Sequence, residues 1–137
     1  EAILMFAWRR FGGRVTARNM ILAAALAGLV RFTIMAFNPP VEVLFFTQLL
    51  HAFSFGMGYF GVVHFIANWT NEANAAEAQG FANMLNMAMA MTALIVFGVL
   101  MEFFGAAAFF YSTITSLAAI GCVLLSLKLR PPKSLVG

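Results

Sequence analysis

The sequence has no aspartate, and only 9% of its residues are charged. A soluble domain carries about 25% charged residues, so this composition excludes an ordinary water-soluble fold. Lysine and arginine are also absent from the whole stretch between Arg31 and Lys128. With 63% hydrophobic residues and a mean hydropathy of +0.92, the chain has the composition of a membrane protein.

The chain has a single cysteine, Cys122, which excludes an internal disulfide and a thiolate metal cluster. The sequence also lacks a nucleophile paired with a base, a metal-ligand spacing, a phosphate-binding loop and a pair of catalytic carboxylates. It therefore predicts no enzyme activity, no cofactor and no metal site. The net charge of +3 does not indicate a nucleic-acid partner, because the basic residues other than Arg31 lie at the edges of apolar runs.

Apolar runs of helical length, separated by short polar segments, cover most of the chain. About 20 apolar residues in a helix span the hydrocarbon core of a bilayer. Residues 1–8 have the pattern of a helix end, and four spans are predicted at about 19–37, 41–67, 77–101 and 106–127. The first of these ends at Asn38-Pro39-Pro40, because proline cannot continue a helix. The sequence therefore predicts an all-α membrane protein with four transmembrane helices and the end of a fifth.

The basic residues set the expected orientation. They gather in the loop 9–18 and in the tail 128–137, whereas the turns on the opposite side carry none. By the positive-inside rule, the loop and the tail are both cytoplasmic. Because the chain opens on Glu1, within an apolar run, we also expect a further part of the protein upstream.

Arg31 and His51 lie well inside the first two predicted spans. They are about 10 Å and about 16 Å from the turn between these spans, at about 1.5 Å per residue, so two antiparallel helices bring them to similar depth. An arginine inside a span costs about 2.5–3.5 kcal/mol, and such groups face a partner or a wet cavity. We predict an Arg31–His51 pair that binds substrate or handles protons, since imidazole titrates near neutral pH. The alternative is that Arg31 reaches the outer surface and His51 only bonds a neighbouring helix.

Further polar residues share faces with this pair or lie on the third span. Gln48 precedes His51 by three residues and lies on the same helix face. Gln79, Asn83 and Asn86 recur at i, i+4 and i+7 and align three amides on one face of the third span. Amides inside a membrane need partners, so this face points into the bundle. Gln48, Asn83 and Asn86 are candidates for cavity lining, while bonding between helices explains the amides equally well.

The short basic loop resembles a known signature. The loop is similar to the cytoplasmic motif of the major facilitator superfamily, an acidic residue followed by Arg-x-Gly-Arg-Arg, at Arg10, Gly12, Gly13 and Arg14. The acidic residue of the motif is replaced here by Arg9, so only half of the motif is present. The whole chain resembles the last third of such a transporter, spans nine to twelve with the end of span eight. The resemblance implies a fold of twelve helices in two halves, in which this piece lines one side of the cavity.

Within the superfamily, the chain looks most like the branch of the phenylpropionic acid transporter and lactose permease. That branch carries an arginine in the ninth span and a histidine in the tenth, separated as Arg31 and His51 are here. The segments LLHAFSFG and AEAQG are similar to the phenylpropionic acid transporter group. Three residues after the histidine, where the lactose permease relatives have a glutamate for proton coupling, this chain has Ser54.

The expected function is secondary transport of small organic solutes by alternating access, as a proton symport. The resemblance implies phenylpropionic acid or similar aromatic acids as substrates and the bacterial inner membrane as the location. The alternatives are a sugar or nucleoside proton symporter of the same superfamily and, from another class, a non-transporting membrane subunit of a larger complex. The expected partners are the lipid bilayer, a small-molecule substrate, protons and the N-terminal part of the same transporter, with no nucleic acid.

Overall fold

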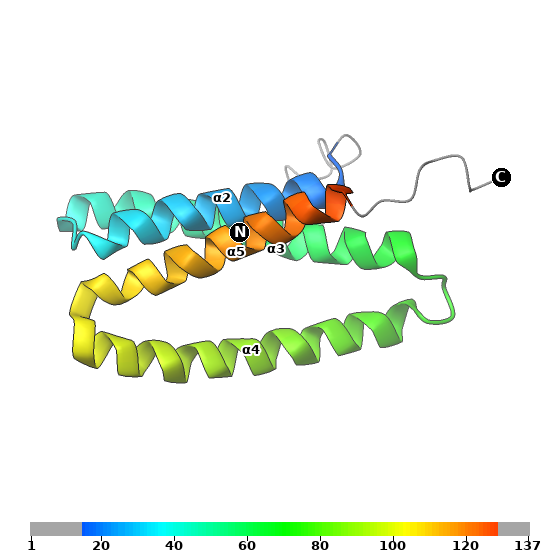
Figure 1. The fold of residues 1–137 in the computed structure, drawn as a ribbon. Coiled ribbons are helices and arrows are strands. Elements are labelled where there is room, and N and C mark those ends of the chain that lie inside the picture. Colours follow the sequence, from blue (N-terminus) through cyan, green and yellow to red (C-terminus); the bar gives the residue numbers. More distant parts are fainter. Residues whose placement is uncertain (1–14, 129–137) are drawn as a thin grey trace.

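A computed structural model describes residues 15–128, and every regular element in this range is helical (Figure 1). The α-helices are α2 (Ala17–Ala36), α3 (Val41–Trp69), α4 (Ala75–Phe104) and α5 (Phe109–Lys128), and the 3-10 helix η2 (Gly105–Ala108) joins the last two. The predicted all-helical architecture is confirmed for this part of the chain. The helix end predicted at residues 1–8 lies outside the described residues.

Three continuous helical stretches within residues 15–128 are long and apolar enough to cross a membrane, where the sequence predicted four separate spans. The third stretch, Ala75–Ser126, has 52 residues. Its length is about 78 Å at 1.5 Å per residue, far more than a core of about 30 Å requires. The stretch turns back at η2, so that α4 and α5 form two arms (Figure 1). The predicted count is matched only in part, because a helical turn and not a polar linker connects these arms.

The turn between α2 and α3 is built from residues that stop a helix. Asn38 adopts a positive φ of 48°, which asparagine tolerates better than most side chains. Pro40 is the N-cap of α3, and Glu42 in the first turn complements the positive end of the helix dipole. The two helices leave this turn antiparallel and lie side by side (Figure 1).

Several helix ends differ from the predicted bounds by a few residues. Thr16 caps α2 by accepting a hydrogen bond from the Asn19 amide at 3.3 Å. Arg18 therefore belongs to the first turn of α2 and not to the predicted loop 9–18. α3 continues to Trp69, and Glu102 lies inside α4 where the sequence predicted a turn. The cap at Thr16 explains the earlier start of α2. None of the three differences in helix bounds changes the order of the helices.

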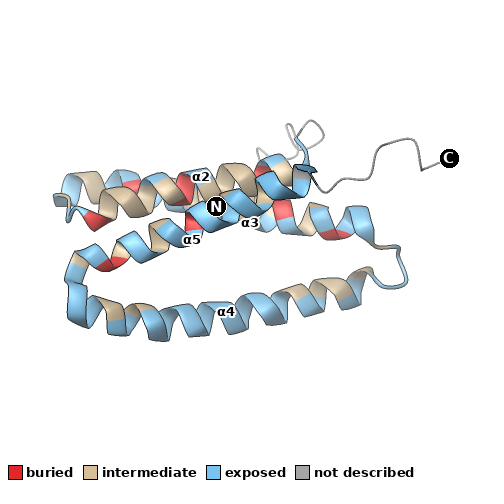
Figure 2. Cartoon of the chain, viewed as in Figure 1, coloured by how far each residue is buried: buried red, intermediate tan, exposed pale blue. Residues whose placement is uncertain are grey.

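The core lies where α2 contacts α3 and α5. Met20 on α2 and Thr47 on α3 are completely buried, and the Thr47 hydroxyl is satisfied because it donates to the Leu44 carbonyl at 2.7 Å. α4 has no buried residue and stands apart from this core (Figure 2). Its apolar surface therefore requires lipid or further helices as its surroundings.

We expect Gly105→Ala to destabilise the α4–α5 hairpin. Gly105 has φ 55° and ψ −138°, a conformation close to the region that only glycine populates. No described atom lies within 4 Å of the position of an added Cβ, so the cost is backbone strain alone, about 1–3 kcal/mol. Thermal unfolding in detergent measures the loss. Gly98→Ala within α4 is the matched control, because its Cβ also meets no described atom; equal destabilisation of both variants would contradict the strain.

Candidate functional site

Arg31 and His51 meet between α2 and α3. Arg31 Nη1 lies 2.8 Å from His51 Nδ1, and because a guanidinium has no acceptor, it donates this hydrogen bond to the imidazole. The contact arises because the turn at 37–40 sets two antiparallel helices side by side, with both residues at similar depth. The Arg31 side chain thus reaches toward α3 and not toward the outer surface.

The rest of the Arg31 guanidinium is only partly satisfied. Its Cζ atom lies 5.1 Å from the centroid of the Phe32 ring, within the range of a cation–π interaction. Its Nε is buried and has no hydrogen-bond partner among residues 15–128. A buried donor without an acceptor costs about 1–3 kcal/mol. Arg31 as a whole is only partly buried, so an oxygen from a bound molecule or from another helix can approach its side chain, but it reaches the enclosed Nε only if the side chain shifts.

An aromatic pocket adjoins the pair, with a volume of about 640 Å³. Its phenylalanine rings come from three helices: Phe32 on α2, Phe97 on α4 and Phe109 on α5. His51 and Tyr111 also line it. The centroids of Phe97 and Phe109 are 4.9 Å apart, and those of Phe32 and Phe109 are 6.3 Å apart. These rings form a continuous apolar wall that begins beside the guanidinium, so a flat or aromatic group fits the pocket.

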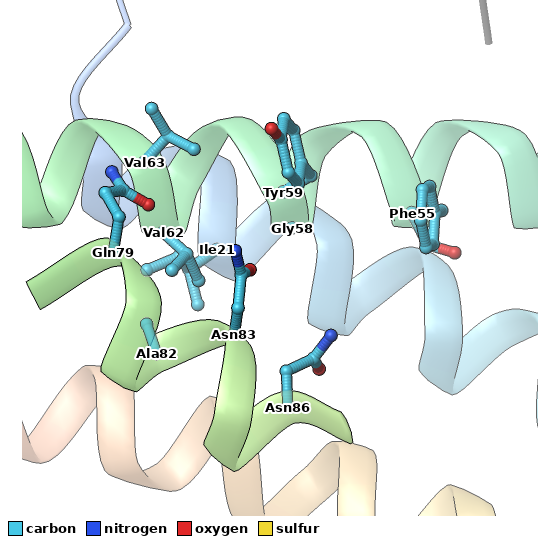
Figure 3. Close-up of a pocket in the computed structure, with 11 residues that line it drawn as sticks. Ile21, Phe55, Gly58, Tyr59, Val62, Val63, Gln79, Ala82, Asn83 and Asn86 are labelled. Atoms are coloured by element: carbon cyan, nitrogen blue, oxygen red, sulfur yellow. The ribbon is translucent and has the colours of Figure 1, made fainter. Parts of the chain in front are cut away.

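An amide pocket of about 360 Å³ lies further along α3 and α4. Gln79, Asn83 and Asn86 line it from α4, and Figure 3 shows the side chains of Gln79 and Asn83 directed toward α3. Ser54 and Tyr59 line it from α3. In the described part of the chain, the lining of this pocket includes no charged side chain. The pocket is therefore suited to neutral groups that donate and accept hydrogen bonds.

The inward face of α4 links the two pockets. Asn86 lines the amide pocket, while Ala90 and Phe97, further along the same face, line the aromatic pocket. On α3, Phe55 lies in the amide pocket with its ring centroid 6.2 Å from that of His51. The two pockets therefore follow one another along the same pair of helices, one polar and one apolar.

The structure separates some of the predicted site residues. Asn83 and Asn86 lie in the amide pocket and not beside Arg31. Gln48 is exposed and, within the described residues, makes no hydrogen bond to the pair. The helix-face argument placed it near His51, but three residues along a helix also shift a side chain by most of a turn in height. The four loop residues of the predicted signature, Arg10, Gly12, Gly13 and Arg14, lie outside the described residues.

Sequence reasoning missed the aromatic residues of the site. The sequence has 16 phenylalanines and two tyrosines, most of them in apolar runs. Nothing in these runs distinguishes Phe32, Phe109 and Tyr59 from side chains that face lipid. The position of Phe32 directly after Arg31 was the one available signal, since aromatic rings often accompany a guanidinium. The contribution of α5 could not be inferred without knowing that it packs against α2.

The model of the family described as MFS_1 like family matches residues 1–112, which include α2, α3, α4 and the start of α5. The match covers 112 of the 137 residues. Among curated proteins and among solved structures, no match was found.

Proposed function

Because the chain belongs to the MFS_1 like family of the major facilitator superfamily and forms part of a membrane transporter, we propose that the intact protein carries small organic solutes by proton-coupled symport. Transport proceeds by alternating access between two halves of the molecule. The chain supplies helices of one half, and an N-terminal part of the same transporter covers the open faces of α3 and α4. Family membership favours this function over the rival of a non-transporting membrane subunit.

The observation that carries the proposal is the Arg31–His51 hydrogen bond, with Arg31 Nε left without an acceptor. A guanidinium inside a span is retained where it has a function, because its insertion is costly. Its planar donors match a carboxylate better than any neutral group. Arg31 thus binds the anionic group of the solute, and His51 is the titratable or hydrogen-bonding neighbour that holds the guanidinium in place.

The aromatic pocket supports aromatic acids, phenylpropionic acid among them, as substrates. A carboxylate on Arg31 would leave the ring of such an acid beside Phe32, Phe97 and Phe109. Stacked and edge-to-face contacts between rings favour this arrangement by about 0.5–1.5 kcal/mol per pair.

A second candidate is a sugar or nucleoside proton symporter of the same superfamily. The amide pocket supports it, because Gln79, Asn83 and Asn86 offer both donors and acceptors without a charge. These amides match the hydroxyl groups of a sugar or the base of a nucleoside.

Proton coupling requires a group that exchanges a proton during transport. The His51 imidazole can take this role only while its hydrogen bond from Arg31 is broken, because a protonated imidazole has no acceptor left for the guanidinium. Ser54, at the position where the lactose permease branch has a glutamate, donates its hydroxyl to the His51 carbonyl at 3.0 Å. A serine cannot exchange the proton itself, so the carboxylate that completes the coupling comes from the rest of the transporter.

We further place the protein in a bacterial inner membrane, with the loop 9–18 and the C-terminus in the cytoplasm. Arg18 at the start of α2 and Lys128 at the end of α5 lie at the ends of helices that run in opposite directions, and therefore at the same end of the bundle. The positive-inside rule supports the cytoplasm for that end.

Uptake by cells that express the full-length protein tests the function. The probes are radiolabelled 3-phenylpropionate, a nucleoside and a sugar, each with and without a protonophore. We expect accumulation of the aromatic acid that collapses when the proton gradient is dissipated. Accumulation of the sugar or the nucleoside alone would favour the second candidate, and accumulation that survives the protonophore would contradict proton coupling.

A further inference from the structure

A third pocket, of about 570 Å³, lies where α2 begins and where α3 and α5 end. We call it the helix-end pocket. Its polar lining is Thr16, Arg18, Asn68 and Ser126, and its apolar lining includes Phe65 and Val123. Arg31, His51 and the three amides of α4 take no part in it. It is therefore separate from the groups proposed to recognise the solute.

The polar lining of the helix-end pocket favours an anion. Arg18 provides the only charge among the described lining residues, and no carboxylate accompanies it there. The Thr16 oxygen accepts from the Asn19 amide, so its hydroxyl proton remains available to a ligand. The Asn68 carboxamide adds further donors. A phosphate group in this pocket thus has a guanidinium, a hydroxyl and an amide among the groups that line it.

The position of the pocket is that of a membrane–water interface. Trp69, another lining residue, is 78% exposed at the end of α3, and its ring centroid lies 6.0 Å from that of Phe65. Tryptophan is enriched at the level of the lipid headgroups. Arg18 lies in the first turn of a spanning helix, and the apolar side chains of Phe65 and Val123 continue the pocket along α3 and α5.

We propose that the helix-end pocket binds an anionic phospholipid, with the phosphate on Arg18 and the glycerol and upper acyl chains against Phe65 and Val123. A cation above an apolar wall matches an amphiphile, and basic pockets between transmembrane helices bind anionic headgroups. A free phosphate would use Arg18 and Asn68 but would leave the apolar wall uncovered. The bound lipid joins the ends of α2, α3 and α5, so it couples membrane composition to the packing of these three helices.

Quenching of Trp69 fluorescence tests the proposal directly. The 137 residues contain two tryptophans, Trp8 and Trp69. In the full-length protein, Trp8 and any tryptophan outside these residues are replaced by phenylalanine, so that Trp69 is the only tryptophan left. The protein is reconstituted in phosphatidylcholine vesicles that contain one brominated lipid as the quencher. This lipid is either brominated phosphatidylglycerol or brominated phosphatidylcholine, with the bromine near the ester group in both. We expect phosphatidylglycerol to bind beside Trp69 about fivefold more strongly, the ratio that corresponds to about 1 kcal/mol per arginine at a lipid surface.

Three substitutions that change the charge at this end of the bundle distinguish a specific pocket from diffuse electrostatic attraction to the protein surface. Arg18→Gln should reduce the preference to about one, whereas Lys128→Gln, outside the pocket on the last turn of α5, should leave most of it. Asn68→Asp, which adds a carboxylate to the pocket without changing its size, should also abolish the preference. Thermal unfolding of each variant establishes that the fold is retained, and Asn68→Asp keeps the test valid if Arg18→Gln fails to fold.

Three results would overturn the proposal. The first is equal quenching by the two brominated lipids in the unaltered pocket. The second is an equal loss of preference in Arg18→Gln and Lys128→Gln, which would assign the effect to the general surface charge. The third is loss of the preference in excess inorganic phosphate at constant ionic strength, which would assign the pocket to a soluble anion. None of these measurements depends on transport, so they remain decisive if the proposed solute is wrong.

Discussion

Arg31→Ala is expected to abolish uptake by the intact transporter while its insertion into the membrane remains normal. The substitution removes the guanidinium that donates to His51 over 2.8 Å and the buried Nε beside it. Hydrogen bonds to charged groups contribute about 1.5–3 kcal/mol, which corresponds to a loss of at least about tenfold in rate. Alanine is better tolerated than arginine inside a span, so a folding defect is not expected to cause the loss.

Arg31→Lys distinguishes the role of the positive charge at this position from the role of the planar guanidinium. Arg31→Lys keeps a positive charge but replaces the planar donors with a single ammonium group. We expect partial uptake from this variant if the charge alone attracts the anionic solute, and almost none if two oxygens must be bound at once. Comparison of KM with maximal uptake rate then separates a weaker hold on the solute from a slower transport step.

Thr33→Val is the matched control for Arg31→Ala. Thr33 lies two residues further along α2 and donates its hydroxyl to the Leu29 carbonyl at 2.7 Å, within its own helix. Valine has nearly the same shape as threonine, and the hydroxyl that it lacks bonds only within α2. Uptake by Thr33→Val should therefore stay near that of the unaltered protein. Undiminished uptake by Arg31→Ala, with equal amounts of protein in the membrane, would remove Arg31 from the proposed site.

Gly61→Ala is expected to loosen the contact between α2 and α3 and to lower the thermal stability of the protein. Gly61 is buried on α3, and a Cβ built there lies 2.6 Å from Ile21 Cγ1. It also lies 3.1 Å from the Ile21 backbone nitrogen and 3.2 Å from the Ala17 carbonyl oxygen. A side chain can rotate away, but backbone atoms cannot, so α2 and α3 must separate.

Overpacking of this kind costs about 1–3 kcal/mol. In a helix, replacement of glycine by alanine otherwise gains about 1 kcal/mol, so the clash must exceed that gain for the variant to be less stable. Gly61→Leu should lower the stability further, because its larger side chain starts from the same Cβ position and needs more room between α2 and α3. Displacement of α2 also moves Arg31 relative to His51, so uptake should fall together with stability.

Gly58→Ala provides the control on the same helix. Its Cβ lies 3.7 Å from the Ala24 Cβ, an ordinary van der Waals distance. We expect unchanged or slightly higher stability in a thermal unfolding experiment in detergent. A Gly61→Ala variant as stable as Gly58→Ala would show that α2 and α3 do not approach as closely as the structure has them.

The sequence contained enough information for the class of fold. Its lack of charge and its apolar runs required helices that span a membrane, because the bilayer leaves no other way to satisfy the backbone of a single segment. It also placed Arg31 beside His51. That contact depends only on the rise per residue and on a tight turn between antiparallel helices, both of which are local.

Only the tertiary structure decided which pocket each of the other aromatic and polar side chains lines. The packing of α5 against α2 brings Phe109 to Phe32 and creates the aromatic pocket, and the approach of α4 to α3 places Asn83 and Asn86 in a pocket away from the guanidinium. Likewise, the joining of α2, α3 and α5 at one end sets Arg18 beside Asn68 and Trp69. A helix pattern gives the face on which each of these residues lies, but not the neighbour that the face meets. That choice depends on how large and small side chains of distant segments fit together.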